Sequence, residues 1–245
     1  RKFPKGRLVN LSRVVLLSAF STRSQAYAQA FANAGFNLGG VLAFGMSSDH
    51  ASTGKRNTEL GLGDLFVPDF SETLLGTCER VGWPVCQVKP RDVNDSAIKI
   101  ALSELDPSLI IYSGYAGQLV GAGILAAGVP ILHMHAGWLP DYRGSTTVYY
   151  SWLEEGRCGV SAILLDHAID TGPIVARRHY PPPPEGLDVD NLYDNAIRAD
   201  LATRVLEVVR ETGDLPNAVP QDKHVGRAYY VIHPVLKHLA LMSKA

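Results

Sequence analysis

The sequence predicts an α/β protein with a Rossmann-like, mostly parallel sheet and helices on both faces. Three observations support this fold class. Short apolar segments alternate with segments of helical periodicity along most of the chain, as in parallel sheets with crossover helices. The chain opens with a strand–helix–strand unit, for which a right-handed crossover is expected. Its 245 residues, with 46% apolar and 19% charged content, suffice for one domain or one and a half with a full core.

Apolar periodicity and turn residues place the elements of the first half. The expected strands are 14–18, 38–44, 84–88, 109–112 and 131–135, and the expected helices are 24–34, 71–81, 94–105 and 121–127. Asn94 is the expected N-cap of its helix. The polar, glycine-containing segment 47–63 is expected to be a loop.

The second half continues with the same kinds of element. The expected helices are 145–155, with Ser145 as N-cap, and 188–211, and the expected strands are 159–165 and 174–180. Prolines at 181–184 end the second of these strands, because proline lacks the ladder donor. Asp194 and Arg198 form an i,i+4 ion pair on the long helix. We expect residues 1–212 to form one α/β domain, with 213–245 as a loop and short helix packed on it.

Charge and cysteine content argue against several classes of function. A formal net charge of −1 gives no electrostatic footprint for nucleic acid or an anionic membrane. No apolar run approaches the ~20 residues of a membrane helix. The basic start and the apolar stretch 14–20 lack a small-residue cleavage site, so a first buried strand is favoured over a signal peptide. Cys78, Cys86 and Cys158 have no metal-ligand spacing and are expected to be reduced thiols of a cytoplasmic protein.

Two histidines mark the candidate site. In a strand over 131–135, His133 and His135 share a face near the strand's C-terminal end, where open α/β sheets build their ligand clefts. A second loop could bring Asp170 to the same place. Two imidazoles and a carboxylate suit proton transfer and stabilisation of a developing oxyanion. They are also the ligand set of non-haem iron, a minor alternative, and we expect no metal.

The segment around these residues resembles the catalytic core of the formyltransferases that use 10-formyltetrahydrofolate. The family includes glycinamide ribonucleotide, methionyl-tRNA and sugar N-formyltransferases. Its pattern is a strand with Asn-x-His, a Leu-Pro-x-x-x-Gly loop, a helix, a strand and an Asp-x-Gly loop. The matching residues are His135, Leu139, Pro140, Gly144, Asp170 and Gly172. The resemblance is best over 108–209, and the two loop motifs at this separation are quite specific.

The resemblance implies catalytic roles for three residues. His135 matches the family's histidine and would shuttle the proton, and Asp170 would orient it and favour its charged form. His133 stands where the family has Asn, and would donate a hydrogen bond to the formyl oxygen. Other interpretations are that Asp170 is a turn residue and that His133 is structural.

The resemblance also implies where the formyl donor, 10-formyltetrahydrofolate, binds. In the family, the segment matching 112–120 contacts the pterin ring and the segment matching 166–170 forms the opposite wall. The residues assigned to donor binding are Tyr115, Gly117, Leu119, Leu139, Asp166 and Ile169. Small residues allow a flat heterocycle to approach closely, although an ordinary strand-to-helix turn explains the glycines as well. A full G-x-G-x-x-G pattern is lacking, so a nicotinamide cofactor is not expected.

The function implied is an N-formyltransferase acting on a small-molecule amine, with an amino sugar or nucleotide sugar favoured. Arg143 could hold a phosphate or carboxylate of the acceptor, or be a solvated loop charge, and Tyr142 could line the acceptor pocket. The alternatives are a hydrolase that releases formate from 10-formyltetrahydrofolate and a non-catalytic folate or nucleotide binder. We expect no nucleic-acid or membrane partner. A homodimer is compatible with the sequence.

Overall fold

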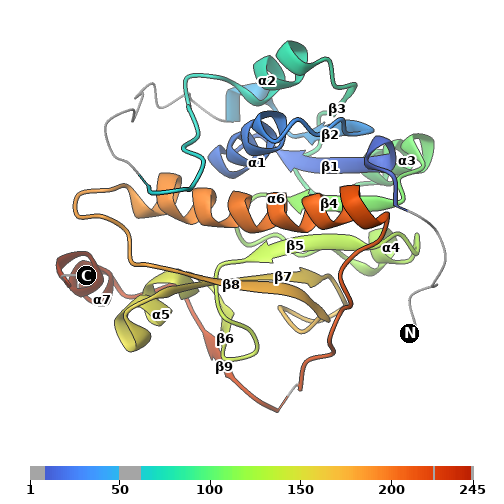
Figure 1. Ribbon diagram of the computed structural model, residues 1–245. Coiled ribbons are helices and arrows are strands. Elements are labelled where there is room, and N and C mark those ends of the chain that lie inside the picture. The colour runs from blue at the N-terminus through green and yellow to red at the C-terminus, as the bar shows by residue number, and fades with distance from the viewer. Residues whose placement is uncertain (1–8, 50–61, 223, 244–245) are drawn as a thin grey trace.

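The computed structural model describes residues 9–49, 62–222 and 224–243, and it has the predicted α/β fold (Figure 1). The main sheet contains β1 (Val14–Ala19), β2 (Gly40–Phe44), β3 (Val85–Val88), β4 (Leu109–Ser113), β5 (Ile131–His135), β7 (Cys158–Leu164) and β8 (Ile174–Tyr180). Their order is β3-β2-β1-β4-β5-β7-β8. The first five strands in this order are parallel, whereas β7 runs antiparallel to β5 and to β8.

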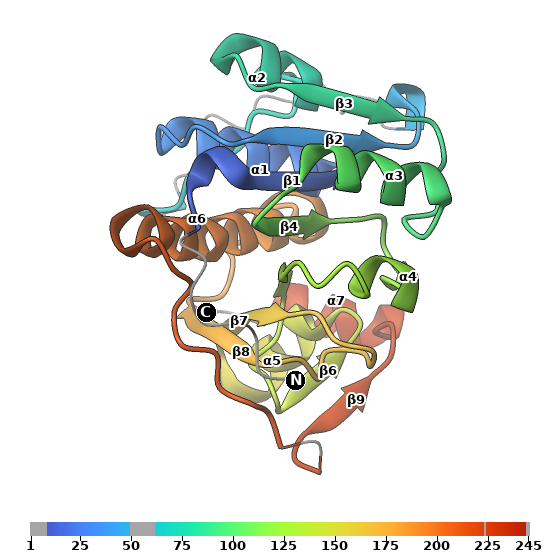
Figure 2. The same ribbon diagram turned by 90° about the vertical axis from the view of Figure 1, so that its right-hand side faces the viewer.

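Helices cover both faces of this sheet (Figures 1 and 2). On one face, α1 (Thr22–Asn33) packs against α2 (Leu74–Val81) and α6 (Asp194–Thr212). On the other lie α3 (Ser96–Leu105) and the short α4 (Ala122–Leu125). Alternation along the strands supplies both cores: Leu16 and Met134 face α1 and α6, and Leu17 and Ile131 face α3.

The strand order determines where a ligand crevice is expected. The chain adds β2 and β3 on one side of β1, then returns to add β4 and β5 on the other side. In open α/β sheets, ligands bind beyond the carboxyl ends of the strands at such a reversal. Helix α1 begins at this edge, directly after β1, with the Ser21 side chain capping its first turn.

A second, two-stranded sheet was not predicted. It pairs β6 (Tyr142–Gly144) in parallel with β9 (Arg227–Tyr229), and lies at the end of the molecule away from β3 (Figure 2). Strands of three residues, paired across more than eighty residues of sequence, carry no detectable alternation. Two helices accompany this sheet, α5 (Thr147–Glu155) and α7 (Pro234–Met242). α7 packs against α5, and Ile232 and Ala240 of the C-terminal segment are buried. The division into domains stays a prediction.

Two predicted N-caps are wrong. Asp95, not Asn94, caps α3 through its bond from the Ala97 amide, because Asn94 is used by the Gly121 amide and the Leu119 carbonyl. Ser145 does not cap α5: its amide pairs with Tyr229, and the N-cap position belongs to the next residue.

The predicted long helix 188–211 starts differently. It opens with one turn of π-helix, η3 (Val189–Tyr193), before α6. The predicted loop 47–63 begins with a short 3₁₀ turn, η2 (Ser47–Asp49), and its residues 50–61 lie outside the described residues; another such turn, η1 (Leu11–Arg13), precedes β1. In the described ranges, no helix has the length and apolar character to cross a bilayer.

Candidate active site

The two histidines of β5 lie on one face of the sheet, as their spacing predicts. β5 pairs with β4 in parallel and with β7 in antiparallel fashion, so it lies where the sheet changes direction. Leu132 and Met134 point into the α1–α6 core, and His133 and His135 alternate with them. The strand therefore presents both imidazoles together.

His135 is held by contacts on both ring nitrogens. Nε2 lies 2.6 Å from the Tyr142 carbonyl oxygen and 3.3 Å from the Thr147 hydroxyl. A carbonyl only accepts, so Nε2 carries the proton and donates it. Nδ1 lies 3.4 Å from Oδ1 of Asp170, with side chains 5% and 11% exposed. With the proton on Nε2, Nδ1 and the carboxylate oxygen are both acceptors, so no hydrogen bond joins them, and the two groups attract only when Nδ1 is protonated.

Burial lowers the pKa of His135, the Asp170 carboxylate raises it, and Arg198 lowers it again. The net direction is downward. We therefore assign a neutral imidazole to the resting protein, with Nδ1 as its basic nitrogen. A proton gained there would be stabilised by Asp170.

Asp170 reaches His135 from the loop between β7 and β8. β7 is antiparallel to β5, so its last residue, Leu164, pairs with Leu132 near the start of β5. The loop that follows β7 must therefore fold back along β5 for Asp170 to reach His135, the last residue of β5. Asp170 has a φ of 54°, a left-handed conformation that Asp tolerates better than most residues. Its Oδ2 accepts from the Gly144 amide at 2.9 Å, so the Leu-Pro loop fixes the carboxylate.

Gly144 and Gly172, the glycines of the two loop motifs, lie so close to other backbone segments that a side chain would not fit there. A Cβ at Gly172 would lie 1.7 Å from the Leu164 carbonyl oxygen. Gly144 has a φ of 100°, and a Cβ there would lie 2.1 Å from the Tyr229 carbonyl oxygen. Only glycine fits such positions without backbone movement. These glycines therefore let the two loops meet at the His135–Asp170 pair.

His133 has a different environment. It is half-buried, its Nδ1 is buried without a hydrogen-bond partner, and its ring lies 5.9 Å from that of Tyr112. Burial holds the pKa of His133 well below its ordinary value, and the charges of Arg198 and Arg23 lower it further. His133 is thus a neutral imidazole, and any hydrogen bond it donates comes from a neutral ring.

The predicted acceptor ligands have other partners. Tyr142 is 3% exposed, and its hydroxyl donates to Glu154, so what it offers the site is its carbonyl to His135. Arg143 donates to the Asp222 carbonyl at 3.0 Å and links β6 to the C-terminal segment. Their roles toward a substrate stay predictions.

The predicted donor-binding residues divide into exposed and buried ones. Leu119 and Ile169 are 58% and 54% exposed on the loops after β4 and between β7 and β8. Gly117 has a left-handed φ of 77°, and the Tyr115 ring packs edge-on against Phe44. The two others have internal contacts: Leu139 is fully buried, and Asp166 accepts bonds from Thr171 and the Ala168 amide within its loop.

Four contributors to the site were not predicted. The Ser161 hydroxyl donates to the Gly137 carbonyl and accepts from the Leu139 amide. A serine within an otherwise apolar strand was the feature of the sequence that could have indicated this residue. Thr147 contacts Nε2 of His135. Gln221 donates to the Asp170 carbonyl at 3.0 Å from the C-terminal segment, without any sequence signal. Arg198 donates to the Met134 carbonyl between the two histidines, and was noted only as an ion-pair partner.

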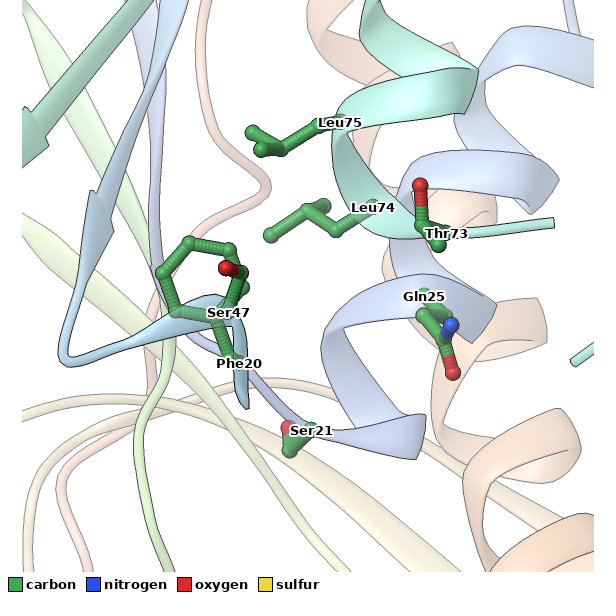
Figure 3. Close-up of a pocket in the computed structure, with 7 residues that line it drawn as sticks. All are labelled: Phe20, Ser21, Gln25, Ser47, Thr73, Leu74 and Leu75. Atoms are coloured by element: carbon green, nitrogen blue, oxygen red, sulfur yellow. The ribbon is translucent and has the colours of Figure 1, made fainter. Parts of the chain in front are cut away.

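A pocket lies at the carboxyl ends of β1 and β2, on the α1–α2 side (Figure 3). Its volume is about 90 Å³, and Leu74 and Leu75 of α2 point toward Phe20 across it. The remaining lining residues are Ser21, Gln25, Ser47 and Thr73. His135 and Asp170 do not line this pocket. Elsewhere in the described ranges, no three His, Cys, Asp or Glu side chains converge as metal ligands.

The chain is thus an α/β protein with a buried histidine–carboxylate pair at the carboxyl end of β5. The formyl transferase family model matches residues 13–205. This match covers most of the chain, which therefore belongs to the formyl transferase family, as the motifs predicted.

Curated relatives match only part of their own length. A methionyl-tRNA formyltransferase from Finegoldia magna is 36% identical over 91 residues, covering 36% of this chain and 29% of that protein. Another, from Roseiflexus sp. (strain RS-1), is 31% identical over 150 residues, covering 58% and 43%. This chain thus matches less than half of the length of either relative.

Solved structures share the fold at low identity. The phosphoribosylglycinamide formyltransferase of Anaplasma phagocytophilum superposes with a TM-score of 0.56 at 17% identity, covering 81% of this chain and 87% of that one. The glycinamide ribonucleotide transformylase 1 of Symbiobacterium toebii gives 0.56 at 18% identity, covering 89% and 96%.

Proposed function

We propose that this chain is an N-formyltransferase that uses 10-formyltetrahydrofolate to formylate a small-molecule amine. The observation that carries the proposal is the buried His135–Asp170 pair, 3.4 Å apart. Membership of the formyl transferase family supports it independently.

His135 serves as the base. Nε2 is held by the Tyr142 carbonyl, so Nδ1 takes the proton that the amine loses as its nitrogen bonds to the formyl carbon. Asp170 stabilises the resulting imidazolium by its charge. The same proton then passes to the leaving nitrogen as the original carbon–nitrogen bond breaks. General acid–base help of this kind contributes typically ~10²–10⁴ in rate.

His133 serves as a hydrogen-bond donor to the formyl oxygen. The family's Asn is a neutral donor, and burial together with Arg198 and Arg23 keeps the pKa of His133 low, so the imidazole is neutral too. One ring N–H can then donate where an amide N–H would. Loss of one such donor typically costs ~10²–10³ in rate.

The donor is assigned to the surface between the loops after β4 and between β7 and β8. 10-Formyltetrahydrofolate supplies the activated formyl group. Leu119 and Ile169 offer exposed apolar side chains there, as a flat heterocycle requires, and Gly117 brings backbone close. We expect Tyr115 to line the same surface.

The acceptor is proposed to be a small amine, with amino sugars and nucleotide sugars the first to test. A net charge of −1 gives no attraction to a polynucleotide. The free state of Cys78, Cys86 and Cys158 fits the cytoplasmic location that we propose.

The test is to incubate the protein with 10-formyltetrahydrofolate and follow formate and tetrahydrofolate with and without a panel of amines. Amine-dependent tetrahydrofolate release that is lost in His135→Gln supports the proposal. Amine-independent formate release would instead make the chain a hydrolase. Donor binding without turnover would leave a non-catalytic binder.

A further inference from the structure

A groove lies at the outer edge of the main sheet, between β8 and α6. Its volume is about 220 Å³. Helix α6 packs against β8, so the two elements form opposite sides of the groove. The lining residues are Ala176, Arg177 and Arg178 of β8, Leu201, Arg204, Val205 and Val208 of α6, and Pro216 from the segment that follows α6.

Strand β8 leaves one side of its backbone without a neighbouring strand. It is the last strand in the order of the sheet. Its first residue, Ile174, forms an isolated antiparallel bridge with Val219, and within the described ranges residues 176–180 have no strand on that side. An open strand edge presents unpaired amide and carbonyl groups, which can pair with a further strand. In this protein the open edge borders the groove.

The floor of the groove is apolar. Leu201 and Val205 are 3% and 2% exposed, and Val208, at 36%, reaches the solvent. Ala176 adds a small apolar side chain from β8. The side chains of an extended peptide alternate between its two faces, so a strand placed along β8 can lay every second side chain on this floor.

The rim of the groove is cationic. Three of its lining residues are arginines, and in the part of the chain that the structure describes none of the lining residues is acidic. Asp200 lies 3.6 Å from Arg178 and 2.8 Å from Arg204, and Glu207 is a further acidic neighbour of Arg204. The side chains of Arg178 and Arg204 are nevertheless 46% and 43% exposed. Both can therefore reach an added carboxylate.

The same charges disfavour a second copy of this chain as the occupant. Two β8 strands paired antiparallel about a two-fold axis would bring Arg177 and Arg178 of one copy opposite the same segment of the other. Like charges in direct opposition destabilise a strand pair. Charged residues on edge strands also protect against unwanted pairing, but that role does not account for a groove with an apolar floor. A partner strand with acidic and apolar side chains fits both features.

We propose that the groove binds an extended, acidic segment of another protein, which adds to β8 as a further strand of the main sheet. Its backbone would pair with the open edge of β8, its apolar side chains would cover Val205 and Val208, and its carboxylates would meet the three arginines. In this mode of recognition the main-chain hydrogen bonds give affinity and the alternate side chains give specificity. The inference does not depend on the proposed formyl transfer.

Binding is tested by calorimetry on the full chain with three short peptides. One alternates glutamate with valine, the second lysine with valine, and the third glutamate with serine. We expect the first to bind saturably and the other two at least about 10-fold more weakly, because the second lacks the charge match and the third lacks the apolar contact. The affinity of the first should fall as salt is added, since exposed charges are screened.

Two variants and a matched control locate the peptide. Arg178→Gln removes a charge from the rim and should weaken binding about 3- to 10-fold, and Val208→Glu places a like charge on the floor and should weaken it about 10-fold or more. Arg80→Gln should bind as the wild type does, because Arg80 pairs with a carboxylate at the opposite end of the molecule, on α2 (Figure 2). Arg177 is left intact because it donates to the Leu139 carbonyl of the Leu-Pro loop. Thermal unfolding checks that each variant is folded.

Hydrogen exchange tests whether the peptide adds as a strand. Backbone amides within 176–180 should gain protection when the glutamate–valine peptide binds. Methylating the backbone nitrogens of either its glutamates or its valines should weaken binding about 10-fold or more in one case only, because alternate N–H groups face the neighbouring strand.

Three results would overturn the proposal: no saturable binding, equal binding of the lysine peptide, or unchanged protection of β8. Self-association of the free chain that grows stronger in Arg178→Gln would also overturn it, because the edge would then belong to a second copy.

Discussion

Replacing Asp170 by Asn removes a charge while keeping the shape of the side chain. Asn also tolerates the left-handed backbone at this position, so the loop should persist. Two full charges 3.4 Å apart interact by about 5 kcal/mol at an effective dielectric constant of about 20. That stabilisation applies only when His135 is protonated, which is the state formed as the amine loses its proton. Asp170→Asn should therefore slow the chemical step.

The expected loss is ~10²–10⁴ in kcat. The pKa of His135 should also fall, because the carboxylate that raises it is gone. In the wild type, activity should decline in acid because His135 becomes protonated and can no longer act as the base. In Asp170→Asn this decline should occur at a lower pH. A pH–rate profile of kcat/KM for the most active amine measures both effects.

Asp106→Asn is the matched control. Asp106 is another left-handed Asp, with a φ of 42°, and it pairs with Arg13 on the surface away from β5. Its variant should retain the wild-type profile. If Asp170→Asn kept kcat within a few-fold and its profile overlaid that of the wild type, the His135–Asp170 pair would have no part in the chemistry.

Four further outcomes follow from the same geometry. Arg198→Gln leaves a carboxylate buried without its partner and should cost about 3–5 kcal/mol of unfolding free energy in denaturant titrations, whereas the more exposed Arg204→Gln should cost under about 1 kcal/mol. His133→Asn should keep or raise activity, and a collapse of turnover would give this histidine a role that Asn cannot fill. Because burial lowers the pKa of both β5 histidines, these residues bind protons more readily in the unfolded chain than in the folded protein. At pH values under about 6.5, each histidine should therefore reduce the unfolding free energy by up to about 1.4 kcal/mol for every further pH unit of acidification. Denaturation at about pH 7 and pH 5 measures this slope, which should be shallower in His133→Asn. Gly172→Ala would place a Cβ 1.7 Å from the Leu164 oxygen, so we expect about 3 kcal/mol of destabilisation or more, and a native-like unfolding curve would contradict the required backbone approach.

The sequence alone determined the fold class, the positions of the seven main strands and the shared face of the two histidines. Each of these depends on local periodicity, which acts over a few residues and can be read directly. The pairing of His135 with Asp170 came from a family resemblance, and the coordinates bring the two together.

Only the tertiary structure decided the rest of the site. β6 and β9 exist because residues 142–144 and 227–229 meet, and neither segment has a pattern that would form a strand alone. Gln221 and Thr147 reach the site through chain folding, and Arg23 and Arg198 both influence His133 because α1 and α6, far apart in sequence, pack together. Burial and the charges that surround it set the pKa of a side chain, and both depend on what packs there rather than on neighbours in sequence.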